Sequence, residues 1–297
     1  MKQIAVIGSG TMGNGIAHVF AQHGFAVNLV DVSPQQLDRA LATIRTNLER
    51  QVAKGTITSA LSQETLARIT PLTSLHEGVS AASLVVEAAT EKEDLKKELF
   101  RQLDEAAPAD CILASNTSSI SITRLAAATR RPDRVIGMHF MNPVPVMKLV
   151  EVINGYATSS AVSRTVCDLC LQLGKTPCLA NDYPGFVANR ILMPMINEAI
   201  LTLQEGVAGV EEIDTIMKLG MAHPMGPLQL ADFIGLDVCL SILRVLYEGF
   251  GQAKYAPCPL LVNMVAAGRL GIKTGEGFYR YEPGSKEKKV SDRFVSR

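Results

Sequence analysis

The stretch AVIGSGTMGNGIAHVF, residues 5–20, places Gly8, Gly10 and Gly13 directly after an apolar, β-branched run. This GxGxxG spacing is typical of the turn between a strand and a helix that receives a dinucleotide pyrophosphate. Gly8 permits the tight turn, Gly10 lets the backbone approach the anion, and Gly13 lets the helix pack closely on the strand. The alternative is a glycine-rich turn in an α/β protein that binds no nucleotide. The order of strand, turn and helix favours a dinucleotide site that also includes Thr11 and Met12.

A carboxylate closes the next apolar run. Asp31 is the last residue of VNLVD, residues 27–31. An acid at this place accepts hydrogen bonds from ribose hydroxyls and repels a 2′-phosphate. The sequence therefore predicts NAD rather than NADP as the cofactor.

The alternation of short β-branched runs with amphipathic stretches indicates an α/β fold for the first part of the chain. We expect a Rossmann-like N-terminal domain with a mainly parallel sheet plus an antiparallel hairpin. The predicted strands span residues 3–8, 26–31, 69–73, 84–87, 112–115, 135–140, 148–153 and 177–180. The predicted helices span residues 12–24, 34–52, 92–106 and 161–173.

Strand signals stop after NDYPGF, residues 181–186, and helical periodicity takes over. We therefore expect two domains, residues 1–183 and 184–297, with Pro184–Gly185 as the hinge. The second is predicted to be all-α, and its tail from Glu282 to be loosely held. Its predicted helices span residues 186–204, 210–219, 228–249 and 259–268.

Composition excludes several classes of function. Apolar residues make up 47% of the 297 residues, and 29 Lys and Arg balance 29 Asp and Glu. Nothing suggests a nucleic-acid partner, and no apolar, charge-free run is long enough for a membrane. The first strand signal begins at residue 2, so a cytoplasmic protein without a leader is expected. Cys167 and Cys170 are interpreted as ordinary thiols on a helix, a redox or metal role being the alternative; no metal site is predicted.

The strongest candidate for acid–base chemistry is a histidine–carboxylate pair. His139 lies near the carboxyl end of a predicted strand, where open α/β sheets bind ligands. Glu151 lies inside an apolar run on the returning strand, and a buried carboxylate needs a partner. The turn MNPVPVM, residues 141–147, can bring the two side by side. Glu151 would then orient the imidazole, whose other nitrogen exchanges a substrate proton. The alternative is a structural buried ion pair.

Polar residues that follow other strand ends are further candidates. Asn116 and Ser118 lie in ASNTSS, residues 114–119, and Asn189 begins the first helix of the second domain. An Asn/Ser turn with a helix cap explains the first segment equally well. The remaining histidines are interpreted as surface or packing residues.

The chain resembles the 3-hydroxyacyl-CoA dehydrogenase family, especially its short bacterial 3-hydroxybutyryl-CoA dehydrogenase members. The resemblance covers almost the whole chain and rests on seven blocks in the same order. These are GSGTMGNGIA, VVEAATEKEDLKKELF, ASNTSS, HFMNPVPVMKLVEVI, PGFVANR, HPMGPLQLADFIGLD and KTGEGFY. Family members usually carry an aromatic residue where this chain has Met141; a methionine fills a similar apolar volume.

The resemblance implies hydride transfer between NAD and C3 of a 3-hydroxyacyl-CoA thioester. It implies His139 as the catalytic base, Glu151 as its orienting acid, and Ser118 and Asn189 as further active-site residues. It also implies a Rossmann-like domain with a protruding helical hairpin, and a homodimer formed through the helical domain. The cofactor contacts it implies, beside the glycine turn and Asp31, fall on Glu91, Lys96, Asn116, Ser118, Asn142 and Lys273.

A basic helix face suits the coenzyme A part of such a substrate. Arg50 and Lys54 are four residues apart in IRTNLERQVAKG, residues 44–55, so they share one face. By resemblance, coenzyme A contacts fall on Asn47 and Lys54, with Arg50 beside them. A solvated charged face is the alternative.

Two other functions compete with this interpretation. A small β-hydroxyacid dehydrogenase would rely on a lysine in the helical domain, and no His–Glu hairpin is expected there. A non-catalytic, structural relative would not need His139, Glu151, Ser118 and Asn189 together. Acyl-chain preference, direction and pathway are not determined by the sequence.

Overall fold

The computed structural model describes residues 3–282 and 288–295. The chain divides into two compact units, Met1–Tyr183 and Pro184–Arg297. Each unit has its own apolar core.

The first unit is built on one sheet of eight strands in the order β3-β2-β1-β4-β5-β6-β7-β8. The six strands from β3 to β6 run parallel, β7 is antiparallel to β6, and β8 is parallel to β7. The prediction of a mainly parallel sheet with one antiparallel hairpin is confirmed. The strands are β1 (Gln3–Ile7), β2 (Ala26–Val30), β3 (Ile69–Leu72), β4 (Leu84–Glu87), β5 (Ile112–Ser115), β6 (Val135–Phe140), β7 (Leu149–Asn154) and β8 (Thr176–Asn181).

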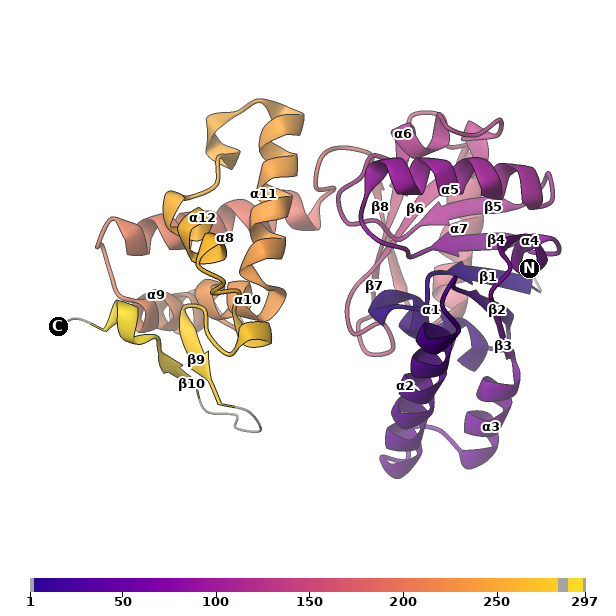
Figure 1. Cartoon of the computed structure of the whole chain (residues 1–297), viewed down its shortest axis with the longest axis horizontal. Coiled ribbons are helices and arrows are strands. Elements are labelled where there is room, and N and C mark those ends of the chain that lie inside the picture. Colours follow the sequence, from indigo (N-terminus) through magenta and orange to yellow (C-terminus); the bar gives the residue numbers. More distant parts are fainter. Residues whose placement is uncertain (1–2, 283–287, 296–297) are drawn as a thin grey trace. The chain divides into compact units, whose positions relative to one another are not determined.

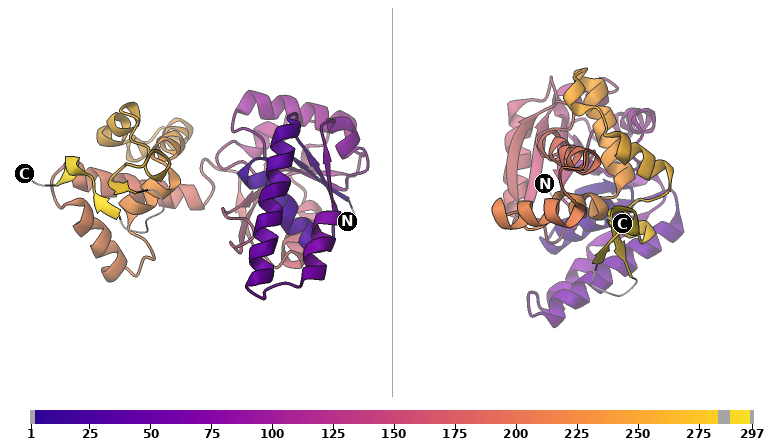
Figure 2. Two further views of the ribbon diagram at one scale, coloured as in Figure 1. Left: turned by 60° about the horizontal axis from the view of Figure 1, so that its bottom comes forward. Right: turned by 90° about the vertical axis from the view of Figure 1, so that its left-hand side faces the viewer.

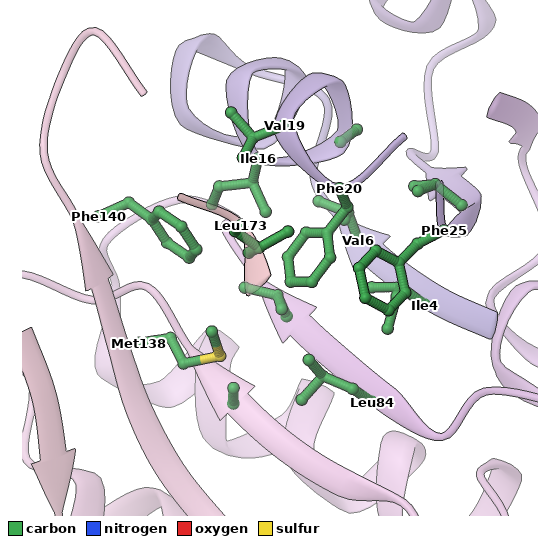
Figure 3. Packing of buried hydrophobic residues seen from close by; sticks show 14 of the residues in the cluster. Ile4, Val6, Ile16, Val19, Phe20, Phe25, Leu84, Met138, Phe140 and Leu173 are labelled. Atoms are coloured by element: carbon green, nitrogen blue, oxygen red, sulfur yellow. The ribbon is translucent and has the colours of Figure 1, made fainter. Parts of the chain in front are cut away.

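The central strands are buried because helices cover the sheet, so they appear in the sequence as apolar runs. Figure 3 shows Ile16, Val19 and Phe20 of the first helix lying against strand residues such as Ile4 and Val6. The helices of this unit are α1 (Thr11–Gln22), α2 (Pro34–Ala53), α3 (Ser59–Ala67), α4 (Leu75–Val79), α5 (Glu93–Ala106), α6 (Ile122–Ala126) and α7 (Ser160–Gln172).

Three of these helices, α3, α4 and α6, were missed by the sequence analysis. Of the α3 residues, only Thr65 is fully buried, so the helix has almost no apolar stripe. Helices α4 and α6 have five residues each, too few for a periodic pattern, although Ser74 and Ser121 cap their N-termini. With α2, helix α3 forms a helical hairpin that extends beyond the sheet (Figures 1 and 2).

The second unit is mainly helical. Its helices are α8 (Ala188–Gln204), α9 (Val210–Thr215), α10 (Pro227–Ile234), α11 (Leu236–Phe250) and α12 (Pro259–Ala266). The single helix predicted over residues 228–249 is wrong, because Gly235 adopts a φ of 103° and separates α10 from α11. The helix predicted to reach residue 219 ends at Thr215 and continues as a π-helical turn, Ile216–Gly220.

The prediction of an all-α second domain needs a correction. Strands β9 (Tyr279–Tyr281) and β10 (Lys288–Val290) form an antiparallel pair. Three residues are too short a run to give a strand signal. The tail predicted to be loosely held is ordered over residues 288–295, where Ser291 is buried; residues 283–287 and 296–297 lie outside the described chain.

Candidate active site and cofactor cleft

The β6–β7 hairpin brings His139 and Glu151 directly opposite each other. Residues that face each other across an antiparallel pair have their side chains on the same side of the sheet. The Nδ1 of His139 lies 2.8 Å from the Glu151 carboxylate, and both residues are buried. Because a carboxylate only accepts hydrogen bonds, Nδ1 must carry the proton of this contact. This leaves Nε2 as the nitrogen that can accept a proton.

Ser118 lies on the Nε2 side of the ring. Its hydroxyl is 3.1 Å from the Nε2 of His139. The segment that carries Ser118 follows β5 and is fixed at two places. The Phe140 amide donates to the side chain of Asn116 at 2.9 Å, and the Ser118 amide donates to Glu91 at 2.9 Å. The structure therefore brings Ser118, His139 and Glu151 together in one hydrogen-bonded row.

Glu87 and Lys96 form a buried ion pair next to the segment that carries Ser118. The sequence analysis did not single out Glu87. Glu87, at the end of β4, is fully buried and accepts from Lys96 Nζ at 2.5 Å. Glu87 also accepts from the Ser115 hydroxyl at 2.6 Å, and Lys96 lies 3.3 Å from Glu91. Lys96 is thus enclosed by protein groups, with 1% of its surface exposed. An acid that ends an apolar strand, as in LVVE, is the signal that would have indicated Glu87.

The glycine turn has the close contacts that its spacing predicts. Gly8 adopts a φ of 95°, which favours glycine. A Cβ on Gly13 would lie 1.7 Å from the carbonyl oxygen of Gly8, so only glycine fits there. At Gly10 a Cβ would meet nothing within 4 Å, so the turn is open on that side. Thr11 and Met12 are the first two residues of α1 and follow the Gly10 N-cap.

A cleft of about 570 Å³ lies at the carboxyl ends of β1, β2 and β4. Its walls include Gly8, Gly10, Asp31 and Ala88. The open glycine turn, the adjoining helix N-terminus and the acid are the groups that a dinucleotide requires, and their placement here fits one.

Asp31 is held in its ionised form. Its carboxylate accepts from the Ser9 amide and hydroxyl at 2.8 Å each and from the Ser33 amide at 3.0 Å. Burial acts to raise the pKa of Asp31, but these hydrogen bonds together outweigh burial and hold the pKa below its usual value. The side chain lines the cleft as a negatively charged acceptor, which suits ribose hydroxyls.

The remaining candidates of the first unit lie outside this row. Asn142 is exposed on the turn after β6, and its peptide bond to Pro143 is cis. Asn47 is half-buried on α2, while Arg50 and Lys54 are exposed at its C-terminal end. Within the described ranges no carboxylate forms a salt bridge with Arg50 or Lys54. Their charges are therefore not neutralised within the unit.

Two candidates belong to the second unit. Asn189 lies in the first turn of α8. Lys273 lies in a 3-10 turn, Ile272–Thr274, and forms a salt bridge with Asp237.

No group of three His, Cys, Asp or Glu residues that could hold a metal ion occurs in the described part of the chain. Cys167 and Cys170 both lie on α7, and burial raises the pKa of Cys170 to about 12. Cys170 is therefore an inert thiol at neutral pH. None of the helices within residues 3–282 and 288–295 is long and apolar enough to cross a membrane.

Comparison with known proteins adds the chemistry that this geometry serves. Residues 3–183 match the family model described as 3-hydroxyacyl-CoA dehydrogenase, NAD binding domain, and residues 185–281 match the C-terminal domain of the same family. The 3-hydroxybutyryl-CoA dehydrogenase of Bradyrhizobium diazoefficiens is 55% identical over 281 residues, which are 95% of this chain and 96% of that protein. The rat mitochondrial hydroxyacyl-coenzyme A dehydrogenase is 43% identical over 95% of this chain and 92% of its own length.

A solved structure has the same fold. The crystal structure of (S)-3-hydroxybutyryl-CoA dehydrogenase from Ralstonia eutropha matches with a TM-score of 0.92 and 51% identity, over 95% of this chain and 99% of that one. Both family models and these relatives cover the two units of the chain. The protein is therefore a member of the 3-hydroxyacyl-CoA dehydrogenase family.

Proposed function

We propose that this protein interconverts 3-hydroxyacyl-CoA and 3-ketoacyl-CoA thioesters with NAD, and that 3-hydroxybutyryl-CoA is its preferred substrate. The observation that carries this proposal is the row formed by Ser118, His139 and Glu151. His139 lies near the carboxyl end of β6, at the same edge of the parallel sheet as the cleft. The preference for a short acyl chain is supported by the relatives that share 55% and 51% identity, both named 3-hydroxybutyryl-CoA dehydrogenases.

His139 is the general acid–base in this proposal. In the oxidation, Nε2 takes the proton of the 3-hydroxyl group while C3 loses a hydride. Bound NAD supplies the acceptor for that hydride. Glu151 keeps the proton on Nδ1 and stabilises the imidazolium that forms when Nε2 is protonated. In the reduction His139 returns the proton to the 3-keto oxygen.

Ser118 and Asn189 are proposed to position the reacting oxygen. The Ser118 hydroxyl already lies within hydrogen-bond distance of Nε2. A group bound to both would be held in line for proton transfer, and such positioning is a large part of catalysis. Asn189 is proposed as a second donor to the reacting oxygen.

The cofactor is proposed to lie along the glycine turn, with Asp31 on the adenosine ribose. Glu91, Lys96, Asn116, Asn142 and Lys273 complete the proposed contacts. Lys96 is buried, and its ammonium group already contacts Glu87, the carbonyl of Ala89 and Glu91, so it would act on the cofactor mainly through Glu91. Asn47, Arg50 and Lys54 of the helical hairpin are proposed to bind coenzyme A.

One assay tests the proposed reaction. Purified protein is incubated with acetoacetyl-CoA and NADH, and oxidation of NADH is followed by absorbance. Turnover with acetoacetyl-CoA, with a lower kcat/KM for longer 3-ketoacyl thioesters, is the expected result. A protein that turns over only free hydroxy acids would be a β-hydroxyacid dehydrogenase instead. A folded protein with no turnover of either would be a non-catalytic relative.

The second unit is proposed to form a homodimer. Several large apolar side chains of this unit are exposed, among them Ile191 and Phe233 on α8 and α10. Exposed apolar groups on a helical surface are typical of a subunit interface. Light scattering at micromolar concentration is expected to give twice the chain mass, and a monomer would contradict the proposal. The cytoplasmic location stays a prediction from the sequence.

A further inference from the structure

A lysine that no motif indicates is buried beside the turn between the two catalytic strands. Lys175 follows α7 and directly precedes β8, and 7% of its surface is exposed. Its ammonium group donates to the carbonyl of Val144 at 2.5 Å and to that of Met147 at 2.7 Å. Both acceptors lie in the turn 141–148, which joins His139 on β6 to Glu151 on β7. Lys175 therefore ties the end of the β7–α7–β8 connection to the turn of the β6–β7 hairpin.

The burial of this charge has a cost that the surroundings do not offset with a second charge. In the described ranges no Asp or Glu forms a salt bridge with Lys175. Burial lowers the pKa of Lys175, which shows that its charged form is disfavoured there. An uncharged, apolar residue of the same length would avoid that cost. What the ammonium adds is two directed donors to two carbonyls that lie three residues apart.

The turn is held from a second side by packing. Val144 is buried in the core, and a Cβ on Gly15 of α1 would lie 2.9 Å from the Val144 side chain. The turn thus fits against the helix that begins at the dinucleotide turn, while Lys175 holds its backbone. The apolar contact of Val144 with α1 sets how closely the turn packs on that helix, and the two hydrogen bonds from Lys175 set its orientation. Both strands that leave the turn carry a member of the His139–Glu151 pair within three residues of their ends.

We propose that Lys175 is a positioning residue for the catalytic pair: its two hydrogen bonds to Val144 and Met147 hold the turn, and thereby the 2.8 Å contact between His139 and Glu151. The inference rests on the proposed function, in which that contact orients the base. Lys175 does not touch substrate or cofactor in this account. Its effect passes through the backbone of the turn to the two strand ends.

A double-mutant cycle separates this role from a merely structural one. Lys175→Met is expected to lower kcat about 10- to 100-fold, since small displacements of a catalytic group have effects of this size. In the Glu151→Gln background the same substitution is expected to lower kcat by about threefold or less, because the contact that Lys175 maintains is already lost. Equal factors in both backgrounds would overturn the proposal.

A matched control lies on the same turn. Lys148 is exposed, and Lys148→Met removes a lysine without removing a buried donor. It is expected to keep the kcat of the unsubstituted protein. If Lys175→Met does not fold, Lys175→Gln takes its place in the same cycle, because its amide can still donate to one carbonyl. A Lys175 variant that is as active as Lys148→Met would contradict the proposal.

Hydrogen exchange gives a measurement that does not depend on activity. The amides of Val146 and Met147 both donate to Pro143 within the turn. Loss of the Lys175 donors is expected to speed exchange at these two amides at least tenfold, with little change in β1 and β2. Unchanged exchange would show that the two Lys175 hydrogen bonds do not hold the turn. An inactive unsubstituted protein would instead contradict the proposed function. In that case the exchange rates alone would decide whether Lys175 holds the turn.

Discussion

Two buried carboxylates, one in each unit, are held in opposite ways. Glu151 is 4% exposed and pairs with the imidazole of His139, a group that can itself gain or lose a proton. Asp232, at the end of α10, is 1% exposed and accepts from the amides of Phe278 and Tyr279 and from the hydroxyl of Tyr281. Backbone amides and a phenol do not change protonation state near neutral pH. The first arrangement suits proton transfer, and the second holds the C-terminal hairpin against the helices.

The difference shows that burial of an acid does not by itself indicate catalysis. What distinguishes Glu151 is a titratable partner whose second nitrogen faces Ser118. The amides and the hydroxyl that donate to Asp232 do not offer a second titratable nitrogen. A Cβ on Gly277 would lie 1.9 Å from the Asp232 carboxylate, so the backbone packs closely around this side chain.

The largest effect on kcat is expected at His139, the partner of Glu151. His139→Gln should lower kcat by about 10²- to 10⁴-fold, the usual contribution of a positioned general acid–base. Binding of NADH, followed by fluorescence titration, should be nearly unchanged. Glu151→Gln keeps the shape but removes the charge that supports the imidazolium, so it should also lower kcat substantially.

The double variant tests whether the two residues form a unit. His139→Gln combined with Glu151→Gln should be little worse than the worse single variant. Losses that multiply would show two independent contributions. A fully active Glu151→Gln enzyme would show that Glu151 has only a structural role, like Asp232.

At Asp232 the expected effect is on stability and not on kcat. In Asp232→Asn the amide donor must face either the Phe278 amide, or the Tyr279 amide together with the Tyr281 hydroxyl, and a mismatched buried group costs about 1–3 kcal/mol. Urea unfolding should report this loss, while kcat of the folded fraction stays unchanged. Glu248→Gln, at an exposed acid of α11, is the control and should leave both unchanged.

The stability effect should depend on pH. Burial raises the pKa of Asp232 from 3.8 to about 6, although the three hydrogen bonds act in the opposite direction. A raised pKa means that the folded state binds the proton more tightly than the unfolded state. The stability this contributes is complete below about pH 4 and is lost as pH rises through about 6. The advantage of the unsubstituted protein over Asp232→Asn should therefore shrink by up to about 3 kcal/mol over that window; a constant difference would contradict the assignment.

Asp31 lies between these extremes, since it is held by protein donors and still lines the cleft. Asp31→Ala should reduce the ratio of kcat/KM for NADH over NADPH about 10- to 100-fold, the effect of losing hydrogen bonds to a charged acceptor. Steady-state kinetics with the two cofactors measures it. Equal use of NADPH by the unsubstituted protein would show that Asp31 does not face the ribose.

The smallest effect is expected at Lys54, which is exposed. Lys54→Glu should raise the KM for acetoacetyl-CoA a few-fold, about the effect of an exposed charge pair, and less at high salt. The KM for an acetoacetyl-pantetheine analogue, which lacks the nucleotide, should not change. An equal rise for both thioesters would place coenzyme A elsewhere.

Much of the first unit was predictable because its local patterns and its fold agree. Strands buried on both faces appear as apolar runs, and the glycine spacing determines where the first of them turns into a helix. The pairing of His139 with Glu151 followed from the hairpin, because two strands joined by a short turn must lie side by side. The C-terminal hairpin and the break at Gly235 were missed, since a three-residue strand and a single glycine leave almost no pattern.

The sequence by itself determined the glycine turn, the acid Asp31 and the hairpin that carries His139 and Glu151, because each depends on residues close together in the chain. Only the tertiary structure decided that Glu87 pairs with Lys96 beneath the Ser118 segment, and that Lys175 reaches Val144 and Met147. Lys175 lies 31 residues from Val144 in the sequence. Such contacts depend on the order of strands in the sheet and on the exclusion of water, which makes an unpaired buried carbonyl or ammonium costly. Neither the strand order nor the exclusion of water can be inferred from the spacing of residues along the chain.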